Sequence, residues 1–275
     1  MSQIRVACVQ MRSGVDVAEN IAATTSLIRE AAGNGATLIA TPEMTTLLDR
    51  QPGGVWAKST SEGADPGLMA FRALARELGV TLLIGSIAIR VEDGKCANRS
   101  FLIAPDGEVI AKYDKIHMFD VQLNAGNIYR ESDSFTAGDE AVIVSLPAGP
   151  LGMTICYDVR FPDLFRTLAW GGAKIIAVPA AFTRITGEAH WHILLRSRAI
   201  ETGCFVIAPA QGGMHQDGRE TFGHSLIIDP WGEVLAEAGV DPGVIFATLD
   251  LSKVDDARGK VPSLKHVRPF RTAGA

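Results

Sequence analysis

The sequence predicts an α/β protein built as a four-layer α-β-β-α sandwich, in which two mixed sheets pack face to face between outer helices. Short apolar strands alternate with amphipathic helices, which is typical of neighbouring strands in one sheet. In addition, the strand–turn–strand segment 99–110 resembles segment 224–235, and each closes a set of strands and helices. Two similar halves would give two such sheets. The alternative, that hairpin sequences of this kind recur by chance, stays open from the residues alone.

The composition is that of a globular protein that does not bind polyanions. The chain has 275 residues, of which 47% are hydrophobic and 21% charged, enough to form a large core. Its formal net charge is −5 and its isoelectric point is about 5.7. These values argue against a nucleic-acid or anionic-membrane surface, although a local basic pocket is compatible with them.

The sequence predicts neither a membrane segment nor an export signal. Its first residues enter a strand directly, without the charged-then-apolar order of a signal peptide, and no apolar run is long enough to span a bilayer. Four cysteines, Cys8, Cys96, Cys156 and Cys204, lie far apart and form no CxxC pair. We therefore expect a cytoplasmic protein with reduced thiols, without a disulfide framework or a zinc site.

Capping residues mark the helices in the first half of the chain. One helix is expected to begin after Asp16, with Glu19 completing a capping box, and to end at Gly33. A second helix is expected to begin at Pro66 and to end at Gly79.

Strands are predicted where short apolar runs end at turn residues. The glycine-rich segment 45–64 is expected to be a loop near the site, and turns are expected at 92–94 and 105–107. The strands expected in this half are 4–10, 36–40, 80–90, 97–104 and 108–113.

Segment 114–140 has no periodicity. A polar stretch of this length inside a compact chain is usually functional or disordered. It contains Lys115, His117 and Glu131, which favours a functional role.

The second half repeats the alternation and ends in a tail. Pro162 is expected to be the first residue of a helix, because its fixed φ and missing N–H cost nothing there. Two or three closing strands are expected to end near Leu249, before a tail that runs to Ala275. The earlier elements expected here are strands 141–146 and 151–156, helix 162–171, strand 174–179, helix 187–203 and strand 204–210.

Cys156 is the candidate nucleophile. It stands at the end of a predicted strand and shortly before a helix, where unpaired N–H groups and the helix dipole can stabilise a thiolate. A cysteine in an apolar strand is also commonly an inert core residue. The assignment therefore depends on partners elsewhere in the chain.

Two charged residues are candidate partners of this thiol. Glu43 directly follows an apolar strand and Pro42, so we expect a partly buried carboxyl group with a raised pKa, suited to a general base. The alternative is a solvated loop glutamate. Lys115 would be a buried ammonium that holds the thiolate and donates to an oxyanion. Lys112 lies within a strand alternation and should point to solvent.

The histidines predict neither a protease nor a metal centre. His117, His190, His192 and His224 stand outside any Cys–His protease motif, so a structural role is expected for them. His190 and His192 are two residues apart on a predicted helix and would point to different faces. We expect no metal ion and no cofactor.

Three motifs in this order resemble the Glu-Lys-Cys triad of the nitrilase (carbon–nitrogen hydrolase) superfamily. They are Glu43 after its strand, Lys115 within YDKIHMFD and Cys156 within CYDVRFP. The similarity extends from Val6 to about Leu251. It implies the four-layer sandwich, usually in a dimer whose subunits extend the sandwich, and it implies no cofactor.

The resemblance also implies a domain division and residue roles. Residues 1–251 would be the carbon–nitrogen hydrolase domain, and the tail 252–275 would pack at the dimer interface. Glu43 would be the general base, Lys115 a stabiliser of the transition state, and Cys156 the nucleophile that forms a thioester.

Two further residues receive roles from the same resemblance. Glu131 matches the second glutamate of the family, which supports the lysine and the substrate. The backbone N–H of Tyr157 would complete the oxyanion hole.

Segments 185–201 and 223–232 resemble the Nit branch of the superfamily. Its members hydrolyse small ω-amido 2-oxo acids or deaminated glutathione, and segment 210–219 looks closer to the enzymes that act on deaminated glutathione. The resemblance thus implies hydrolysis of a terminal amide, with release of ammonia, on a small substrate that carries a carboxylate.

Three residues are candidates for binding that substrate. Arg160, four residues after the nucleophile, has the right charge to pair with its carboxylate, and the alternative is a surface ion pair. By resemblance, Phe182 and Thr186 would line the same pocket.

Other functions stay open. Arg130 and segment 123–129 depart from the branch near the expected site entrance. The alternatives are an ω-amidase acting on 2-oxoglutaramate, another carbon–nitrogen hydrolase with a nitrile, carbamoyl or aliphatic amide substrate, and a catalytically idle scaffold.

Overall fold

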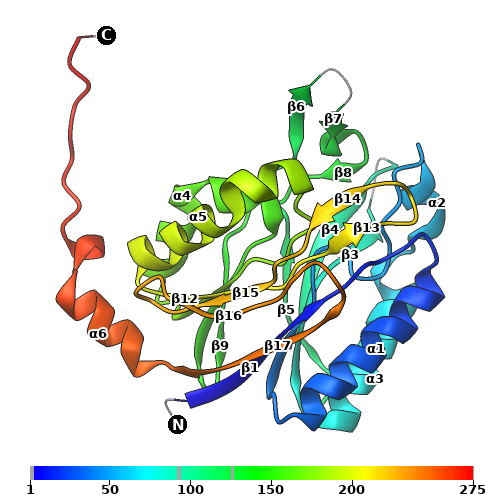
Figure 1. Cartoon of the computed structure of the whole chain (residues 1–275), viewed down its shortest axis with the longest axis horizontal. Coiled ribbons are helices and arrows are strands. Elements are labelled where there is room, and N and C mark those ends of the chain that lie inside the picture. The colour runs from blue at the N-terminus through cyan, green and yellow to red at the C-terminus, as the bar shows by residue number, and fades with distance from the viewer. Residues whose placement is uncertain (1–2, 92–93, 125–126, 275) are drawn as a thin grey trace.

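The computed structural model describes residues 3–91, 94–124 and 127–274 (Figure 1). The turn predicted at 92–94 therefore lies mostly outside the described residues, as do residues 125–126 of the divergent segment 123–129.

The first sheet is mixed and is covered on its outer face by two helices. Its strand order is β17-β1-β2-β3-β4-β5, with β8 pairing β4. Strands β1, β2 and β3 are parallel, and β17, β4 and β5 run antiparallel to their neighbours. The bounds are β1 (Gln3–Gln10), β2 (Leu38–Ala40), β3 (Thr81–Arg90), β4 (Cys96–Ile103), β5 (Val109–Asp114), β8 (Phe135–Thr136), β17 (Gly243–Asp250), and, for the helices, α1 (Val17–Gly33) and α3 (Pro66–Leu78).

The second sheet is also mixed and has its own two helices. Its strand order is β16-β15-β12-β11-β10-β9, in which β10, β11 and β12 are parallel. The bounds are β9 (Val142–Leu146), β10 (Gly149–Met153), β11 (Ile175–Ala177), β12 (Phe205–Ala208), β15 (Leu226–Ile228), β16 (Val234–Glu237), α4 (Pro162–Trp170) and α5 (Arg184–Thr202).

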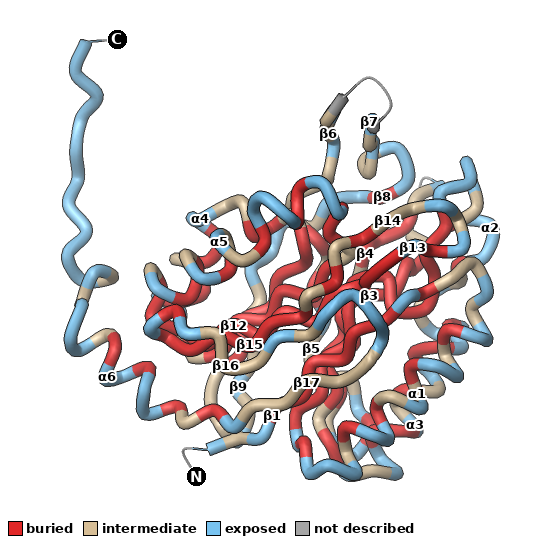
Figure 2. Tube along the Cα trace, viewed as in Figure 1, coloured by how far each residue is buried: buried red, intermediate tan, exposed pale blue. Residues whose placement is uncertain are grey.

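The two sheets pack face to face, which confirms the predicted four-layer sandwich. Side chains of β1 show why. Val6 and Cys8 join a core cluster that also contains Leu151 of the second sheet, whereas Ala7 joins a separate cluster with Phe71 of α3. Alternate residues of a strand point to opposite faces, so each inner strand is buried on both sides. Figure 2 shows these strands buried at the centre of the molecule.

The two similar segments of the sequence, 99–110 and 224–235, occupy equivalent places in the two sheets. Segment 99–110 runs from β4 into β5, and segment 224–235 runs from before β15 into β16. Each pair forms an edge of its own sheet. After β16 the chain crosses back to the first sheet, where its last strand, β17, pairs with β1 along its whole length, from Gln3↔Asp250 to Gln10↔Gly243.

Several boundaries differ from the sequence predictions. The predicted loop 45–64 contains a short helix, α2 (Gly54–Lys58), because one helical turn is too short to show a periodicity. Segment 114–140 contains a hairpin of β6 (Asp120–Asn124) and β7 (Asn127–Arg130) that pairs only with itself in the described chain. The closing strands include one more hairpin, β13 (Gly212–Met214) and β14 (Glu220–Phe222).

The tail begins as part of the body. Helix α6 (Ser252–Lys260) buries Val254, and Arg258 donates to the carbonyls of Thr202 (3.0 Å) and Ala173 (2.8 Å). Beyond η4 (Ser263–Lys265) the chain is exposed and extends away from the body (Figure 1). In the described residues, no helix combines the length and apolarity needed to cross a membrane.

Gly85 links the first sheet to the segment that follows β2. It lies in β3 where the pairing with β4 shifts register, and its N–H donates to Thr41 Oγ1 at 3.0 Å. A Cβ on Gly85 would overlap the backbone oxygens of Thr41 and Pro42. The position therefore requires glycine, and the next residue of the contacted segment is Glu43.

We expect Gly85→Ala to destabilise the fold by about 1–3 kcal/mol, the usual cost of overpacking a rigid site, and to displace Glu43. Thermal unfolding measures the first effect and amide turnover the second. Gly33→Ala is the matched control, because its Cβ would meet open space at the end of α1. Equal unfolding temperatures for the two variants would contradict the close packing of Gly85 against the backbone of Thr41 and Pro42.

Candidate active site

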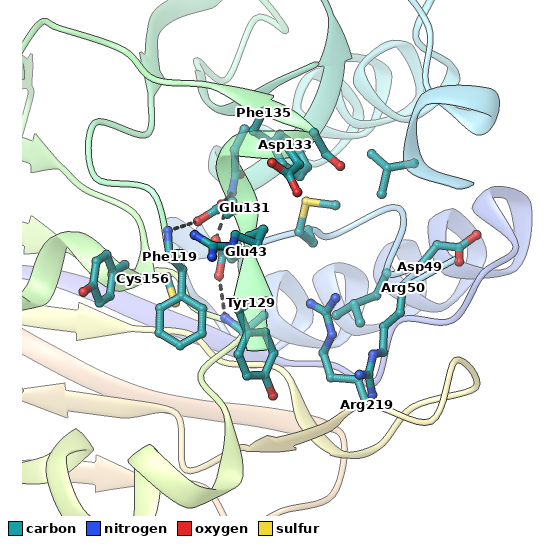
Figure 3. Close-up of a pocket in the computed structure, with 18 of the residues that line it drawn as sticks. Glu43, Asp49, Arg50, Phe119, Tyr129, Glu131, Asp133, Phe135, Cys156 and Arg219 are labelled. Carbon is teal, nitrogen blue, oxygen red and sulfur yellow. Dashed lines mark hydrogen bonds between the residues drawn. The ribbon is translucent and has the colours of Figure 1, made fainter. Parts of the chain in front are cut away.

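A pocket of about 440 Å³ opens at the carboxyl ends of β2, β5 and β10 (Figure 3). Strand ends in α/β folds commonly carry such sites. Among the predicted site residues, those that line it are Glu43, Lys115, Glu131, Cys156, Tyr157, Phe182 and Thr186.

Cys156 stands on a sharp turn between β10 and α4. It begins the short 3₁₀ helix η3 (Cys156–Arg160), and its φ of 48° lies in the left-handed region that side chains other than glycine rarely adopt. Its N–H donates to the Pro179 carbonyl at 2.9 Å. Such backbone strain, of order 1–3 kcal/mol, persists where the surroundings hold it and often marks a functional position. Pro162 is the first residue of α4, as predicted.

Glu43 is buried beside the thiol. Its Oε1 accepts hydrogen bonds from Lys115 Nζ and Asn98 Nδ2, each at 2.9 Å, and its Oε2 accepts from the Ala181 N–H at 2.8 Å. With 4% of its surface exposed, it is not the solvated loop glutamate of the alternative reading.

Lys115 joins the two glutamates. It follows β5 directly, is 2% exposed, and places Nζ 2.9 Å from Glu43 Oε1, 2.9 Å from Glu131 Oε1 and 2.8 Å from Glu131 Oε2. Glu131 in turn accepts from the Phe119 N–H at 2.6 Å. Lys112, by contrast, is half exposed and pairs with Glu62, as the strand alternation predicts.

Asn98 is a site residue that sequence reasoning missed. It lies within β4, is 1% exposed, and its Nδ2 donates to Glu43 Oε1 (2.9 Å) and Glu131 Oε1 (3.1 Å). Its Oδ1 is buried without a hydrogen-bond partner in the described chain. A polar residue in a strand usually faces solvent, so its position in the sequence held no signal of this role.

Burial and charge set the protonation states of the cluster. Burial raises the pKa of Glu43, but the charge of Lys115 and hydrogen bonds from Lys115, Cys156 and Ala181 bring it below the usual 4.5. Burial and the charge of Glu43 raise the pKa of the Cys156 thiol well above 9.0, against the charge of Lys115. Burial lowers the pKa of Lys115, but the charges of Glu131 and Glu43 raise it well above 10.5.

Two electrostatic predictions from the sequence are therefore wrong in direction. The pKa of Glu43 is lowered because the ammonium of Lys115 outweighs burial. Cys156 is a thiol because its sulfur faces a carboxylate in a buried site. The dipole of the predicted helix cannot offset this, since that helix begins only at Pro162 and the effect of a helix dipole falls off within the first turn. If Cys156 is the nucleophile predicted from the sequence, proton transfer from Sγ to Glu43 has to accompany its attack.

Asp158 holds the turn that carries Cys156. Its buried Oδ2 accepts from the Ile155 N–H (2.8 Å) and the Tyr113 hydroxyl (2.6 Å). Its Oδ1 accepts from the His117 N–H at 3.1 Å and lies 2.7 Å from His117 Nδ1. Asp158 thus ties the Cys156 turn to the chain on both sides of Lys115, and His117 has the structural role expected for it.

Tyr157 lines the pocket next to Cys156. As the second residue of η3, it has an N–H that no carbonyl of that helix can accept. Its assignment to an oxyanion hole stays a prediction, as do the catalytic roles of the other residues.

Two of the three predicted substrate-binding residues line the pocket, and the third does not. Phe182 and Thr186 line the pocket, with the Thr186 hydroxyl 2.8 Å from that of Thr183. Arg160 is not among the residues that line the pocket. Its guanidinium lies over the rings of Tyr157 and Phe182, and its Nη2 is 3.2 Å from His190 Nδ1. The prediction that Arg160 binds a carboxylate stays a prediction.

Among the described residues, a group that could hold a metal ion lies outside this pocket. His192 Nε2 and His224 Nδ1 lie 2.9 and 2.8 Å from the same Glu237 oxygen. Their potential ligand atoms are within 4.8 Å of one another, and all three side chains are partly exposed. The same contacts are ordinary hydrogen bonds of a surface cluster, so they do not establish a metal centre.

Comparison with known proteins identifies relatives over nearly the whole chain. Residues 5–259 match the carbon–nitrogen hydrolase family. A protein of Synechocystis named deaminated glutathione amidase is 41% identical over 270 residues, which cover 97% of this chain and 98% of the relative.

Solved structures agree with this result. The NitFhit protein of C. elegans is 34% identical, with a TM-score of 0.90 over 97% of this chain and 65% of that one. A mutant amidase of Nesterenkonia, in which acrylamide has added to the active-site cysteine, is 26% identical, with a TM-score of 0.79 over 94% of this chain and 98% of that one.

We expect the ultraviolet absorbance of a thiolate at Cys156 to be absent at neutral pH and to appear only at strongly alkaline pH, because burial and Glu43 raise the pKa of the thiol well above its usual value. The difference spectrum between the wild type and Cys156→Ala measures it and cancels the other cysteines. A difference band already present at neutral pH would show a preformed thiolate and contradict this electrostatic account.

Proposed function

The chain belongs to the carbon–nitrogen hydrolase family, and from this premise we propose that it is a cysteine-dependent amidase whose preferred substrate is deaminated glutathione. The observation that carries the proposal is the buried contact of Glu43, Lys115 and Glu131 beside Cys156 at the base of a large pocket. Relatives of the same length that bear this name support the substrate.

The first half-reaction transfers the acyl group to sulfur. Glu43 accepts the thiol proton as Cys156 Sγ attacks the amide carbonyl carbon. Lys115 Nζ and the Tyr157 N–H stabilise the resulting oxyanion. Glu43 then gives its proton to the amide nitrogen, the C–N bond breaks, and a thioester remains.

The second half-reaction hydrolyses the thioester and regenerates the free enzyme. Glu43 takes a proton from a water molecule as the oxygen of that water attacks the thioester carbonyl carbon. The C–S bond breaks, Sγ regains its proton from Glu43, and the carboxylic acid leaves. The lowered pKa of Glu43 keeps it ready to accept a proton at neutral pH. Cys156 must stay a free thiol throughout, so we propose a reducing compartment such as the cytoplasm.

The proposed substrate requires a correction to the leaving group expected from the sequence. Deaminated glutathione carries its 2-oxoglutaryl group on the amine of cysteinylglycine, so its amides are secondary. Hydrolysis at that bond releases cysteinylglycine and 2-oxoglutarate, not ammonia. Ammonia is the leaving group only for primary amides such as 2-oxoglutaramate, which is the second candidate substrate.

The size of the pocket favours the larger substrate. Its volume of about 440 Å³ is in the range of sites that bury drug-sized ligands. A 2-oxoglutaryl group held at Cys156 would fill only the inner part, and a peptide amine would occupy the rest.

We expect kcat/KM to be higher for deaminated glutathione than for 2-oxoglutaramate or simple aliphatic amides, with 2-oxoglutarate or ammonia formation as the measurement. Cys156→Ala and Glu43→Gln should each lower kcat by about 10³-fold or more, because they remove the nucleophile and the base. Cys96→Ala, at another buried cysteine, should keep wild-type activity.

Each result that contradicts the proposal would point to a different conclusion. Activity close to wild type in Cys156→Ala would remove this mechanism. A preference for 2-oxoglutaramate would make the protein an ω-amidase, turnover of uncharged amides alone would exclude a carboxylate-bearing substrate, and no turnover at all would favour an idle scaffold.

We also propose that the chain forms a dimer through the outer face of its second helical layer. Trp170 of α4 and Ile193 and Ile200 of α5 are large apolar side chains that are exposed on that layer. The exposed tail beyond α6 carries Phe270, which is 93% exposed and would be covered by a partner. Exposed apolar patches of this kind commonly mark interfaces.

We expect the wild type to sediment as a dimer and Ile193→Asp to sediment as a monomer, because a carboxylate would be buried unpaired at the interface. Met69→Asp is the matched control on the opposite helical layer, where Met69 of α3 is similarly exposed. A monomeric wild type, or a dimer that Ile193→Asp leaves unchanged, would contradict this interface.

A further inference from the structure

Two arginines line the outer part of the pocket and take no part in the proposed chemistry. They are Arg219, from the turn between β13 and β14, and Arg50, from the segment after β2. Figure 3 shows both on the side of the pocket away from Cys156. Since the proposed chemistry uses neither arginine, their place in the pocket wall requires an explanation.

The turn that carries Arg219 is firmly held. The His215 N–H donates to the Arg219 carbonyl at 2.8 Å. The buried ring of His215 lies between the Ser13 carbonyl (2.8 Å from Nδ1) and the Thr221 hydroxyl (2.6 Å from Nε2). The backbone of Arg219 is thus fixed before any ligand binds.

The guanidinium of Arg219 lacks a close acceptor within the described chain. Its Nε is buried without a hydrogen bond, and the nearest carboxylate oxygen, Asp217 Oδ2, is 3.9 Å away. That separation is too long for a hydrogen bond. Arg219 and Asp217 thus form a long ion pair, and the Nε donor of Arg219 stays unused within the described chain.

Two carboxylates of the pocket, Asp49 and Asp133, could compete for these arginines. The first is hydrogen-bonded to other residues, and the second lies on a different side of the pocket. Asp49 accepts from Lys58 Nζ at 2.7 Å and from the Gln51 N–H at 2.8 Å, and its side chain is 2% exposed. Asp133 lines the pocket near Phe135, away from the arginines (Figure 3). The two arginines are therefore available to an anion that enters the pocket.

We propose that Arg219 and Arg50 form a subsite for a carboxylate on the amine half of the substrate. This inference rests on the proposed function, in which the acyl half is bound at Cys156 and Lys115 and the amine half extends outward. Guanidinium groups bind carboxylates through paired hydrogen bonds. The subsite selects N-acyl amino acids and N-acyl dipeptides over primary amides.

The test uses two substrates that differ only at the far end: deaminated glutathione and the same molecule with its terminal carboxylate converted to an amide. The wild type should favour the carboxylate form by about tenfold or more in kcat/KM. Arg219→Gln and Arg50→Gln should each reduce this preference, and the double variant should abolish it. All three should hydrolyse 2-oxoglutaramate, which has no amine half, as the wild type does.

The controls separate binding from folding. Arg72→Gln, on α3 outside the pocket, should keep the preference, and Arg219→Lys should keep part of it. Unfolding temperatures of all variants identify any that lose structure. A preference that survives in the double variant would overturn the subsite, and so would an equal loss on all three substrates, which would place the arginines at the acyl half.

A turnover-independent measurement separates this inference from the proposed function. If the wild type hydrolysed none of these substrates, the proposed function would fail, and the same two molecules would then be tested as protectants of Cys156 against iodoacetamide. Protection by the carboxylate form alone, lost in Arg219→Gln, would retain the subsite. Equal protection by both forms, or by neither, would overturn it.

Discussion

The site depends on one buried ammonium. Lys115 Nζ lies within 2.9 Å of carboxylate oxygens from both Glu43 and Glu131, and almost none of its side chain contacts solvent. A buried charge is tolerated only when its partners are held in place, because removal of one partner leaves an uncompensated ion. The ends of β2 and β5, the side chain of Asn98 from β4 and the short helix at Glu131 meet this requirement together.

This ion cluster also determines how the thiol can react. With two glutamates and one lysine around it, the site has no spare positive charge to hold a thiolate at rest. In the proposed mechanism the proton of Cys156 passes to Glu43, a carboxylate already beside it whose pKa is lowered by the same lysine. The left-handed φ of Cys156 and the hydrogen bonds of Asp158 hold the sulfur near this base.

Different parts of the fold supply the two ends of the pocket. The inner end comes from strand ends and is held rigidly by both sheets. The outer end comes from the segment after β2 and the β13–β14 turn, which carry Arg50 and Arg219. Many proteins hold binding residues on connecting segments around a rigid scaffold, because these segments can vary without disturbing the core. The proposed subsite would therefore make substrate choice depend on those segments.

The sequence by itself determined the local structure and the identity of the candidate reacting groups. The cap at Asp16, Pro162 at the start of α4 and the alternation in β1 depend on neighbouring residues, and the structure agrees with each. Glu43, Lys115 and Cys156 stand in recognisable motifs directly after strands. Only the tertiary structure decided how these groups interact, because 72 positions separate Lys115 from Glu43. The lowered pKa of Glu43, the role of Asn98 and the placement of Arg219 rather than Arg160 in the pocket all follow from such distant contacts, which no local pattern encodes.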